Sequence, residues 1–251
     1  MATALLQGKF AVVTGAASKR GLGKATAKLF AEHGATVAIL DLDEAAAKEA
    51  AADLGPQHVG MACDVTDLDG VKAVMDKLAA TWGAIDILVN NAGITQPLKI
   101  MEIAPKNYDA VLDVNLRGTL YCSQAVIPHM RSRKEGKIVN LSSVSAQRGG
   151  GVFGKVPYSA AKAAILGFTK ALAREIADSG VTVNSVTPGA ADTNIRVGAT
   201  PESEARLAAD IPIGRVATTD EIAAVFTFLS SRDAAYLQGT NIDINGASHL
   251  H

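Results

Sequence analysis

The chain has 251 residues, a formal net charge of −1 at pH 7, 48% hydrophobic residues and only 4% aromatic residues. Lysines and arginines are scattered, so the chain lacks the basic surface that nucleic acid or an anionic membrane requires, and we expect neither partner. No linker, charge block or low-complexity tract interrupts the sequence, which favours a single domain over residues 1–251 with an aliphatic core.

The N-terminal residues and the cysteines indicate the cellular location of the protein. Residues 1–7 lack the charged start and long apolar run of a signal peptide and are interpreted as an N-terminal tail. No apolar run approaches the roughly 18 residues of a membrane span. Cys63 and Cys122 lie in apolar segments without metal-ligand spacing, so buried free thiols are expected rather than a disulfide, and no metal site is predicted. We therefore expect a cytoplasmic protein.

Short β-branched runs alternate along the chain with longer stretches rich in Ala, Leu, Lys and Glu. The runs predict strands over residues 10–14, 36–40, 59–63, 85–90, 137–141, 181–186 and 241–244. The stretches predict helices over residues 22–33, 44–54, 68–82, 107–133, 158–178 and 219–230. Such alternation predicts an α/β Rossmann fold, a doubly wound parallel seven-stranded sheet with helices on both faces. A βα barrel is the weaker alternative.

A glycine-rich turn follows the first predicted strand. Glycines here let the backbone turn sharply and approach a pyrophosphate at a helix N-terminus, although a purely structural turn explains them about equally well. The cofactor contacts expected in this turn are Gly15, Ser18, Arg20, Gly21, Leu22 and Gly23.

Asp41 ends the second predicted strand, at about the ~20-residue spacing where a carboxylate can bind the adenosine ribose hydroxyls. A 2′-phosphate would repel this carboxylate, so Asp41 favours NAD over NADP. An ordinary helix N-cap is the competing interpretation.

Tyr158 and Lys162 stand four residues apart, on one face of a predicted helix. A cation beside a phenol favours the phenolate and makes the phenol useful for proton transfer near neutral pH. A Tyr–Lys pair is also common on plain helix surfaces, so these two residues need support from others.

That support comes from the order of motifs along the chain, which resembles the short-chain dehydrogenase/reductase family of the Tyr-xxx-Lys type. The resemblance runs from about Gly8 to Gly246 and rests on Thr14-Gly15 with Gly21-Leu-Gly23, Asp64-Val65, Asn90-Asn-Ala-Gly93, Asn115, Asn140-Leu-Ser-Ser143, Tyr158-xxx-Lys162, and Pro188-Gly189 with Thr193.

The resemblance implies a role for each matching residue. Tyr158 would be the general acid/base, and Lys162 would lower the pKa of Tyr158 and bind the nicotinamide ribose. Ser143 would hydrogen-bond the substrate oxygen, and Asn115 would support a water relay to Lys162. Further implied cofactor contacts are Asp64, Val65, Asn91, Ala92, Gly93, Tyr158, Pro188, Gly189, Thr193 and Ile195.

Several of these residues also have a structural explanation. A turn-capping role explains Asp64 nearly as well, and a bracing turn explains residues 90–93. Residues from about 190 to 215 are expected to cover the substrate, with Arg196 to Asp210 as the lid, although a plain surface helix is an equal alternative.

The sequence departs from the family pattern twice. Gly15 and Gly21 enclose five residues instead of three, including Lys19 and Arg20, which could attract a 2′-phosphate in opposition to Asp41. The spacing from Ser143 to Tyr158 is two residues longer than usual, which leaves Ser142 and Ser145 as alternatives to Ser143. We favour NAD and Ser143.

The leading functional hypothesis is an NAD-dependent dehydrogenase of a secondary alcohol such as a polyol or sugar, or the reverse reduction of a ketone. An NADPH-dependent ketone or 3-oxoacyl-thioester reductase is the alternative, and a non-catalytic dinucleotide-sensing scaffold is the second. The resemblance also implies a homotetramer built through residues 107–133 and 158–178 and the last strand.

Overall fold

The computed structural model describes residues 4–150, 154–194 and 200–250. One sheet of seven parallel strands forms its centre, in the order β3-β2-β1-β4-β5-β6-β7. The strands are β1 (Phe10–Thr14), β2 (Thr36–Asp41), β3 (Val59–Ala62), β4 (Ile87–Asn90), β5 (Gly136–Leu141), β6 (Val181–Pro188) and β7 (Asn241–Ile244). The predicted Rossmann fold is confirmed.

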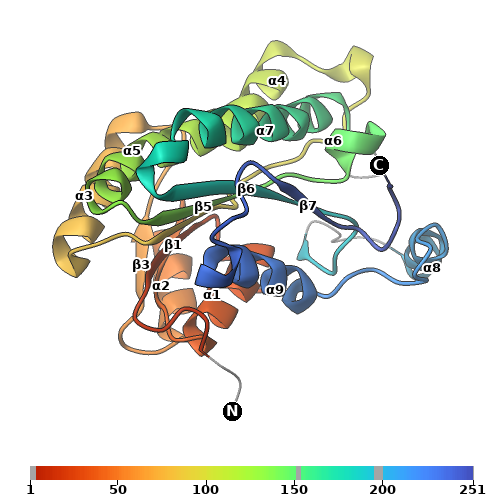
Figure 1. The fold of residues 1–251 in the computed structure, drawn as a ribbon. Helices are drawn as coiled ribbons and strands as arrows, with labels where there is room; N and C mark the ends of the chain where they lie inside the picture. Colours follow the sequence, from red (N-terminus) through yellow and green to blue (C-terminus); the bar gives the residue numbers. More distant parts are fainter. Residues whose placement is uncertain (1–3, 151–153, 195–199, 251) are drawn as a thin grey trace.

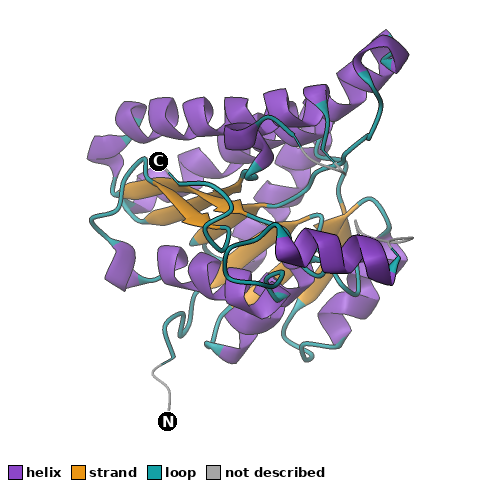
Figure 2. Cartoon of the chain, turned by 90° about the vertical axis from the view of Figure 1, so that its right-hand side faces the viewer, coloured by secondary structure: helices purple, strands orange, loops and turns teal. Residues whose placement is uncertain are grey.

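Helices cover both faces of the sheet (Figures 1 and 2). One layer contains α1 (Leu22–Glu32), α2 (Glu44–Ala52) and α9 (Thr219–Ser230), and the other contains α3 (Leu68–Trp82), α5 (Gly118–Arg133) and α7 (Val156–Glu175). Successive residues of a strand point to opposite faces, so Val13 packs with Phe30 and Phe226 in one core while Val12 packs with Met75 in the other. Burial on both faces explains why these strands are continuous apolar runs.

Strands β1 and β4 are neighbours in the sheet although they are distant in sequence. Strands β2 and β3 lie on one side of β1, and strands β4 to β7 lie on its other side. The Thr14 hydroxyl oxygen at the end of β1 accepts hydrogen bonds from the backbone N–H groups of Asn91 and Ala92, both at 3.1 Å, just after β4. Ligands of doubly wound sheets bind where the strand order reverses in this way, beyond the carboxyl ends of the strands. The fold therefore places the site here.

The predicted helix over residues 107–133 is not one continuous α-helix. It consists of α4 (Pro105–Leu112), a π-helical turn η2 (Asp113–Arg117) and α5. A π turn widens the helix by one residue without requiring a particular residue type, so residue periodicity does not reveal it. Two further helices, α6 (Ser145–Arg148) and α8 (Pro201–Ala209), lie outside the predicted elements, although a surface helix in place of the lid was the stated alternative for α8.

The N-terminal residues that the structure describes are attached to the end of α1. Leu6 is fully buried, its N–H donates to the carbonyl oxygen of His33, and the N–H of Gly8 donates to that of Gly34. Both cysteines are buried free thiols, as predicted. Among the described helices, each is too short or too polar to traverse a bilayer.

Candidate active site

A cavity of about 550 Å³ opens at the carboxyl ends of the strands. The predicted site residues that line it are Gly15, Ser18, Gly21, Leu22, Asp41, Asp64, Val65, Asn91, Ala92, Gly93, Asn115, Ser143, Tyr158, Lys162, Pro188, Gly189 and Thr193. Gly23 and Arg20 are not part of its wall, and Ile195 lies outside the described residues. The structure thus brings together residues that span most of the sequence.

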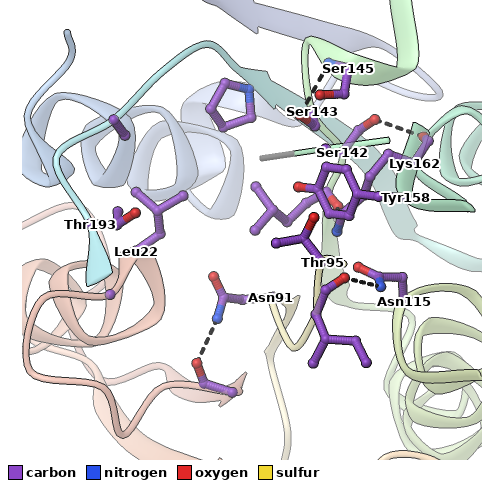
Figure 3. A pocket seen from close by; sticks show the side chains of 18 of the residues that line it. Leu22, Asn91, Thr95, Asn115, Ser142, Ser143, Ser145, Tyr158, Lys162 and Thr193 are labelled. Atoms are coloured by element: carbon purple, nitrogen blue, oxygen red, sulfur yellow. Dashed lines mark hydrogen bonds between the residues drawn. The ribbon is translucent and has the colours of Figure 1, made fainter. Parts of the chain in front are cut away.

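The proton-transfer candidates gather on one side of this cavity. Figure 3 shows Ser143 beside Tyr158 and Lys162, with Leu22 and Thr193 across the cavity. Tyr158 and Lys162 come from consecutive turns of α7, whereas Ser143 follows β5. A rigid helix and a buried strand therefore fix the relative positions of the three side chains.

Lys162 is buried, and its amine donates a hydrogen bond to the carbonyl oxygen of Leu141 at 2.8 Å. The same nitrogen lies 5.7 Å from the ring centroid of Tyr158. Burial disfavours the charged form and lowers the pKa of Lys162 to about 7. The charge of this side chain therefore changes near neutral pH.

The pKa of Tyr158 shifts in the direction opposite to the expected one. Burial raises the pKa of the phenol, and a hydrogen bond from the Ser143 side chain lowers it by less. Lys162 was expected to lower this pKa through its positive charge, but Lys162 itself loses that charge near pH 7. Activation of the phenol thus depends on the protonation state of Lys162.

The three candidate serines have different partners. Ser142 is buried and its hydroxyl donates to the backbone carbonyl oxygen of Lys162 at 2.8 Å. The Ser143 hydroxyl oxygen accepts the N–H of Ser145 at 3.1 Å and hydrogen-bonds Tyr158. All three serines line the cavity, but only Ser143 is hydrogen-bonded to the phenol among the described residues, and Ser142 braces α7.

Asn115 lies in the π-helical turn and is fully buried. Its amide nitrogen donates to the carbonyl oxygens of Ile94 at 2.8 Å and Val111 at 2.9 Å, and its buried Oδ1 has no hydrogen-bond partner among the described residues. A Cβ at Gly93 would lie 2.6 Å from this Oδ1 and 3.4 Å from Lys162 Nζ. A side chain at residue 93 would therefore collide with the Asn115 amide, and Gly93 leaves both polar atoms uncovered by a side chain of its own.

The glycine turn has the shape of a dinucleotide cradle. Gly15 has a φ of +62°, and a Cβ there would lie 2.6 Å from the Ala92 Cα. A Cβ at Gly23 would lie 2.6 Å from Asn91 Nδ2 and 2.8 Å from the Ala16 Cα. Helix α1 begins with no side-chain cap at Gly21, which leaves its first N–H groups available to a phosphate. These residues fit a bound pyrophosphate.

Asp41 and Asp64 line the end of the cavity away from Tyr158. The carboxylate of Asp41 accepts the backbone N–H groups of Ala17 at 3.0 Å and Leu42 at 2.9 Å. Asp64 Oδ1 accepts the backbone N–H and the hydroxyl of Thr66 at 2.8 and 2.7 Å, so the turn-capping interpretation holds alongside its place in the cavity wall.

Sequence reasoning missed residues that line the cavity, among them Leu42, Ile94, Thr95 and Ser248. Ile94 and Thr95 directly follow the recognised motif at residues 90–93, and that adjacency was the available signal. Leu207 lies on α8 and Asp210 directly after it, so the described part of the expected substrate-covering segment does reach the cavity. Ser248 belongs to the C-terminal residues, for which no role was predicted.

The fold and site define a class, namely a Rossmann-fold α/β protein in which a Ser, a Tyr and a Lys side chain meet at a cavity beside a glycine-rich turn. Comparison with known proteins agrees with this class. A family model described as Enoyl-(Acyl carrier protein) reductase matches residues 15–249. The chain belongs to the short-chain dehydrogenase/reductase family and is a nicotinamide-dinucleotide-dependent oxidoreductase.

Individual relatives match along almost their whole length. An uncharacterized short-chain type dehydrogenase/reductase, y4mP, of Sinorhizobium fredii is 46% identical over 98% of this chain and 100% of its own. The 3-oxoacyl-(acyl-carrier-protein) reductase FabG of Vibrio cholerae is 39% identical over 98% of this chain and 99% of its own. The enzyme of the same name in Escherichia coli is 37% identical over 97% and 98%.

Proposed function

We propose that the protein transfers hydride between NAD and a secondary alcohol or the matching ketone, with Tyr158, Lys162, Ser143 and Asn115 as its catalytic residues. The observation that carries this proposal is the convergence of the Tyr158 phenol, the Lys162 amine and the Ser143 hydroxyl at one cavity beside a dinucleotide cradle. The bound nicotinamide supplies the hydride donor or acceptor.

The residues of the chain would handle the proton. In alcohol oxidation, Tyr158 accepts the hydroxyl proton as the substrate carbon loses hydride, and Ser143 donates a hydrogen bond to the substrate oxygen. In ketone reduction, Tyr158 returns the proton. Protonated Lys162, 5.7 Å from the ring, stabilises the phenolate in either direction.

The choice of NAD rests on the end of β2. Asp41 lines the cavity with both carboxylate oxygens fixed by backbone N–H groups, so its negative charge is held where a 2′-phosphate would have to lie. Lys19 is paired with Glu49 and Arg20 with Asp192, and neither cation lines the cavity.

A second candidate function is reduction of a 3-oxoacyl thioester with NADPH. The names of the relatives that are 39% and 37% identical favour this class of substrate. Its substrate would need a surface for a phosphopantetheine carrier. A polyol or sugar substrate would instead rely on polar groups such as Thr95 and Ser248 within the cavity.

The remaining proposals concern assembly and location. A homotetramer formed through α5, α7 and β7 is proposed on family resemblance. A cytoplasmic location is supported by two buried thiols that remain unpaired.

The test is absorbance at the reduced-nicotinamide band with polyols, sugars and secondary alcohols plus NAD⁺ or NADP⁺, and with ketones and 3-oxoacyl thioesters plus NADH or NADPH. Turnover that prefers NAD⁺ and vanishes in Tyr158→Phe supports the proposal. Turnover only of 3-oxoacyl thioesters with NADPH favours the second candidate. Dinucleotide binding without any turnover favours the scaffold.

A further inference from the structure

The longer glycine turn carries two cations whose side chains leave the cavity in different directions. Lys19 Nζ lies 2.9 Å from Glu49 Oε1 on α2, and the guanidinium of Arg20 pairs with Asp192 beyond β6. Ser18 and Gly21, on either side of the two cations, do line the cavity. The backbone of the turn is therefore at the site while its charges are held elsewhere.

The turn that carries Lys19 is attached to Asp41 at one point and to α2 at another. Ala17, two residues before Lys19, donates its N–H to the Asp41 carboxylate at 3.0 Å, and α2, which carries Glu49, begins three residues after Asp41. The amine of Lys19 is bound to Glu49 and not to Asp41.

The neighbouring cation is neutralised in the same way. Lys24 on α1 pairs with Asp53, the C-cap residue of α2, at 2.6 Å. Lys19 and Lys24 are therefore both bound to carboxylates of α2 and its C-cap. Among the described residues, the Asp41 carboxylate has backbone N–H partners and no cationic partner. This arrangement makes the adenosine end of the cavity unfavourable for an additional phosphate.

We propose that Glu49 is a positioning residue for cofactor selectivity: it holds Lys19 away from Asp41 and so preserves discrimination against a 2′-phosphate. The inference rests on the proposed preference for NAD. Glu49 does not line the cavity and acts only through Lys19.

The size of the effect follows from the exposure of the pair. The side chains of Lys19 and Glu49 are 74% and 59% exposed, so their attraction is weak and the effect of removing it on cofactor binding is small. In Glu49→Gln, the Lys19 amine would be available to attract the 2′-phosphate of NADPH. The repulsion between that phosphate and the Glu49 carboxylate would also be absent. We expect Glu49→Gln to tighten NADPH binding about two- to fivefold and to leave NADH binding within about 1.5-fold.

The experiment measures dissociation constants of NADH and NADPH by nicotinamide fluorescence for the parent, Glu49→Gln, Lys19→Gln and the double variant. Glu44→Gln is the matched control, because Glu44 lies on the same helix, is 55% exposed and pairs with Lys48 at 2.7 Å. It removes the same charge without releasing Lys19. Unchanged NADH affinity reports that each variant is folded.

The inference predicts that NADPH binding tightens only in Glu49→Gln and returns to the parent value when Lys19→Gln is added. It is overturned if Glu49→Gln behaves like Glu44→Gln, or if Lys19→Gln alone weakens NADPH binding in the parent. A parent that prefers NADPH overturns the NAD assignment and this inference together, whereas an NADH-preferring parent with an inert Glu49→Gln overturns this inference alone.

Discussion

The amine of Lys162 lies 5.7 Å from the ring centroid of Tyr158, one helical turn away, and is hydrogen-bonded to the backbone carbonyl oxygen of Leu141. Lys162 therefore influences the phenol through its electric field, and that field exists only while the amine is protonated. Because burial brings the pKa of Lys162 to about 7, ordinary changes of pH alter both the charge at the site and the stability of the fold.

Lys162 should make the stability of the cofactor-free protein rise between pH 7 and pH 9. Below pH 7 the lysine is protonated in both the folded and unfolded states, and folding bears the full cost of burying the charge. Between pH 7 and pH 9, the unfolded chain keeps the proton that the folded chain has lost, so Lys162 contributes an increase in the free energy of unfolding of up to about 1.4 kcal/mol per pH unit. Above pH 9 the buried thiols of Cys63 and Cys122, whose pKa values burial raises, oppose this increase. Urea unfolding between pH 7 and pH 9 measures the slope.

Lys162→Met should remove that part of the slope. Lys170→Met is the matched control, since Lys170 is an exposed residue of the same helix. Equal slopes in the parent and Lys162→Met would contradict the depressed pKa.

Tyr158→Phe should lower kcat by about 10²- to 10⁴-fold, because the ring loses the only group that exchanges a proton with substrate. NADH affinity should remain within about twofold, since α7 and the cradle are unaffected. Turnover and NADH titration measure the two quantities, and a variant that keeps a tenth of the parent kcat would assign proton transfer to another group.

Alanine substitutions of the three serines should change different measured quantities. Ser143→Ala should lower kcat/KM by about 10²- to 10³-fold through loss of a donor to the substrate oxygen. Ser142→Ala should instead lower the free energy of unfolding by about 1–2 kcal/mol, because its buried hydroxyl binds the backbone of Lys162. Ser145→Ala should cost less than Ser143→Ala in turnover, and the reverse order would move the substrate contact to Ser145.

Gly23→Ala should weaken NADH binding at least tenfold and destabilise the fold by about 1–3 kcal/mol, because the methyl group would meet Asn91 and the Ala16 backbone. Gly167→Ala in the middle of α7 is the control. A Cβ there meets nothing within 4 Å, so the change should stabilise the helix by about 0.5–1 kcal/mol. NADH titration and urea unfolding test both, and equal effects would mean that the close approach at Gly23 is unimportant.

The sequence predicted the fold where local pattern and burial agree. Residues 10–14 form β1 as predicted, because a strand buried on both faces must be a continuous apolar run. The fourth strand was predicted from Ile85 but begins at Ile87, and the side chain of Asp86, just before it, accepts the N–H of Phe10 at 2.8 Å. That side-chain contact crosses 76 residues and leaves no local pattern.

Within the site, motif order predicted which residues meet but not their electrostatics. Tyr158 and Lys162 were placed correctly on one helix face, whereas the direction of the Tyr158 pKa depends on burial by residues from other elements. Likewise, the partners of Lys19 and Arg20 lie on α2 and beyond β6, so only the structure could show that these cations turn away from Asp41.

The π-helical turn at Asp113–Arg117 makes the number of residues in this segment as important as their identity. Deleting one residue would allow α4 and α5 to join as a regular helix, and α5 would keep its apolar face on the sheet, because the π turn accommodates one more residue than an α-helical turn. The backbone of the new turn would take over the carbonyl oxygen of Val111, and Asn115 would lose its contacts with Val111 and Ile94. The extra residue therefore serves the position of Asn115 and not the packing of α5.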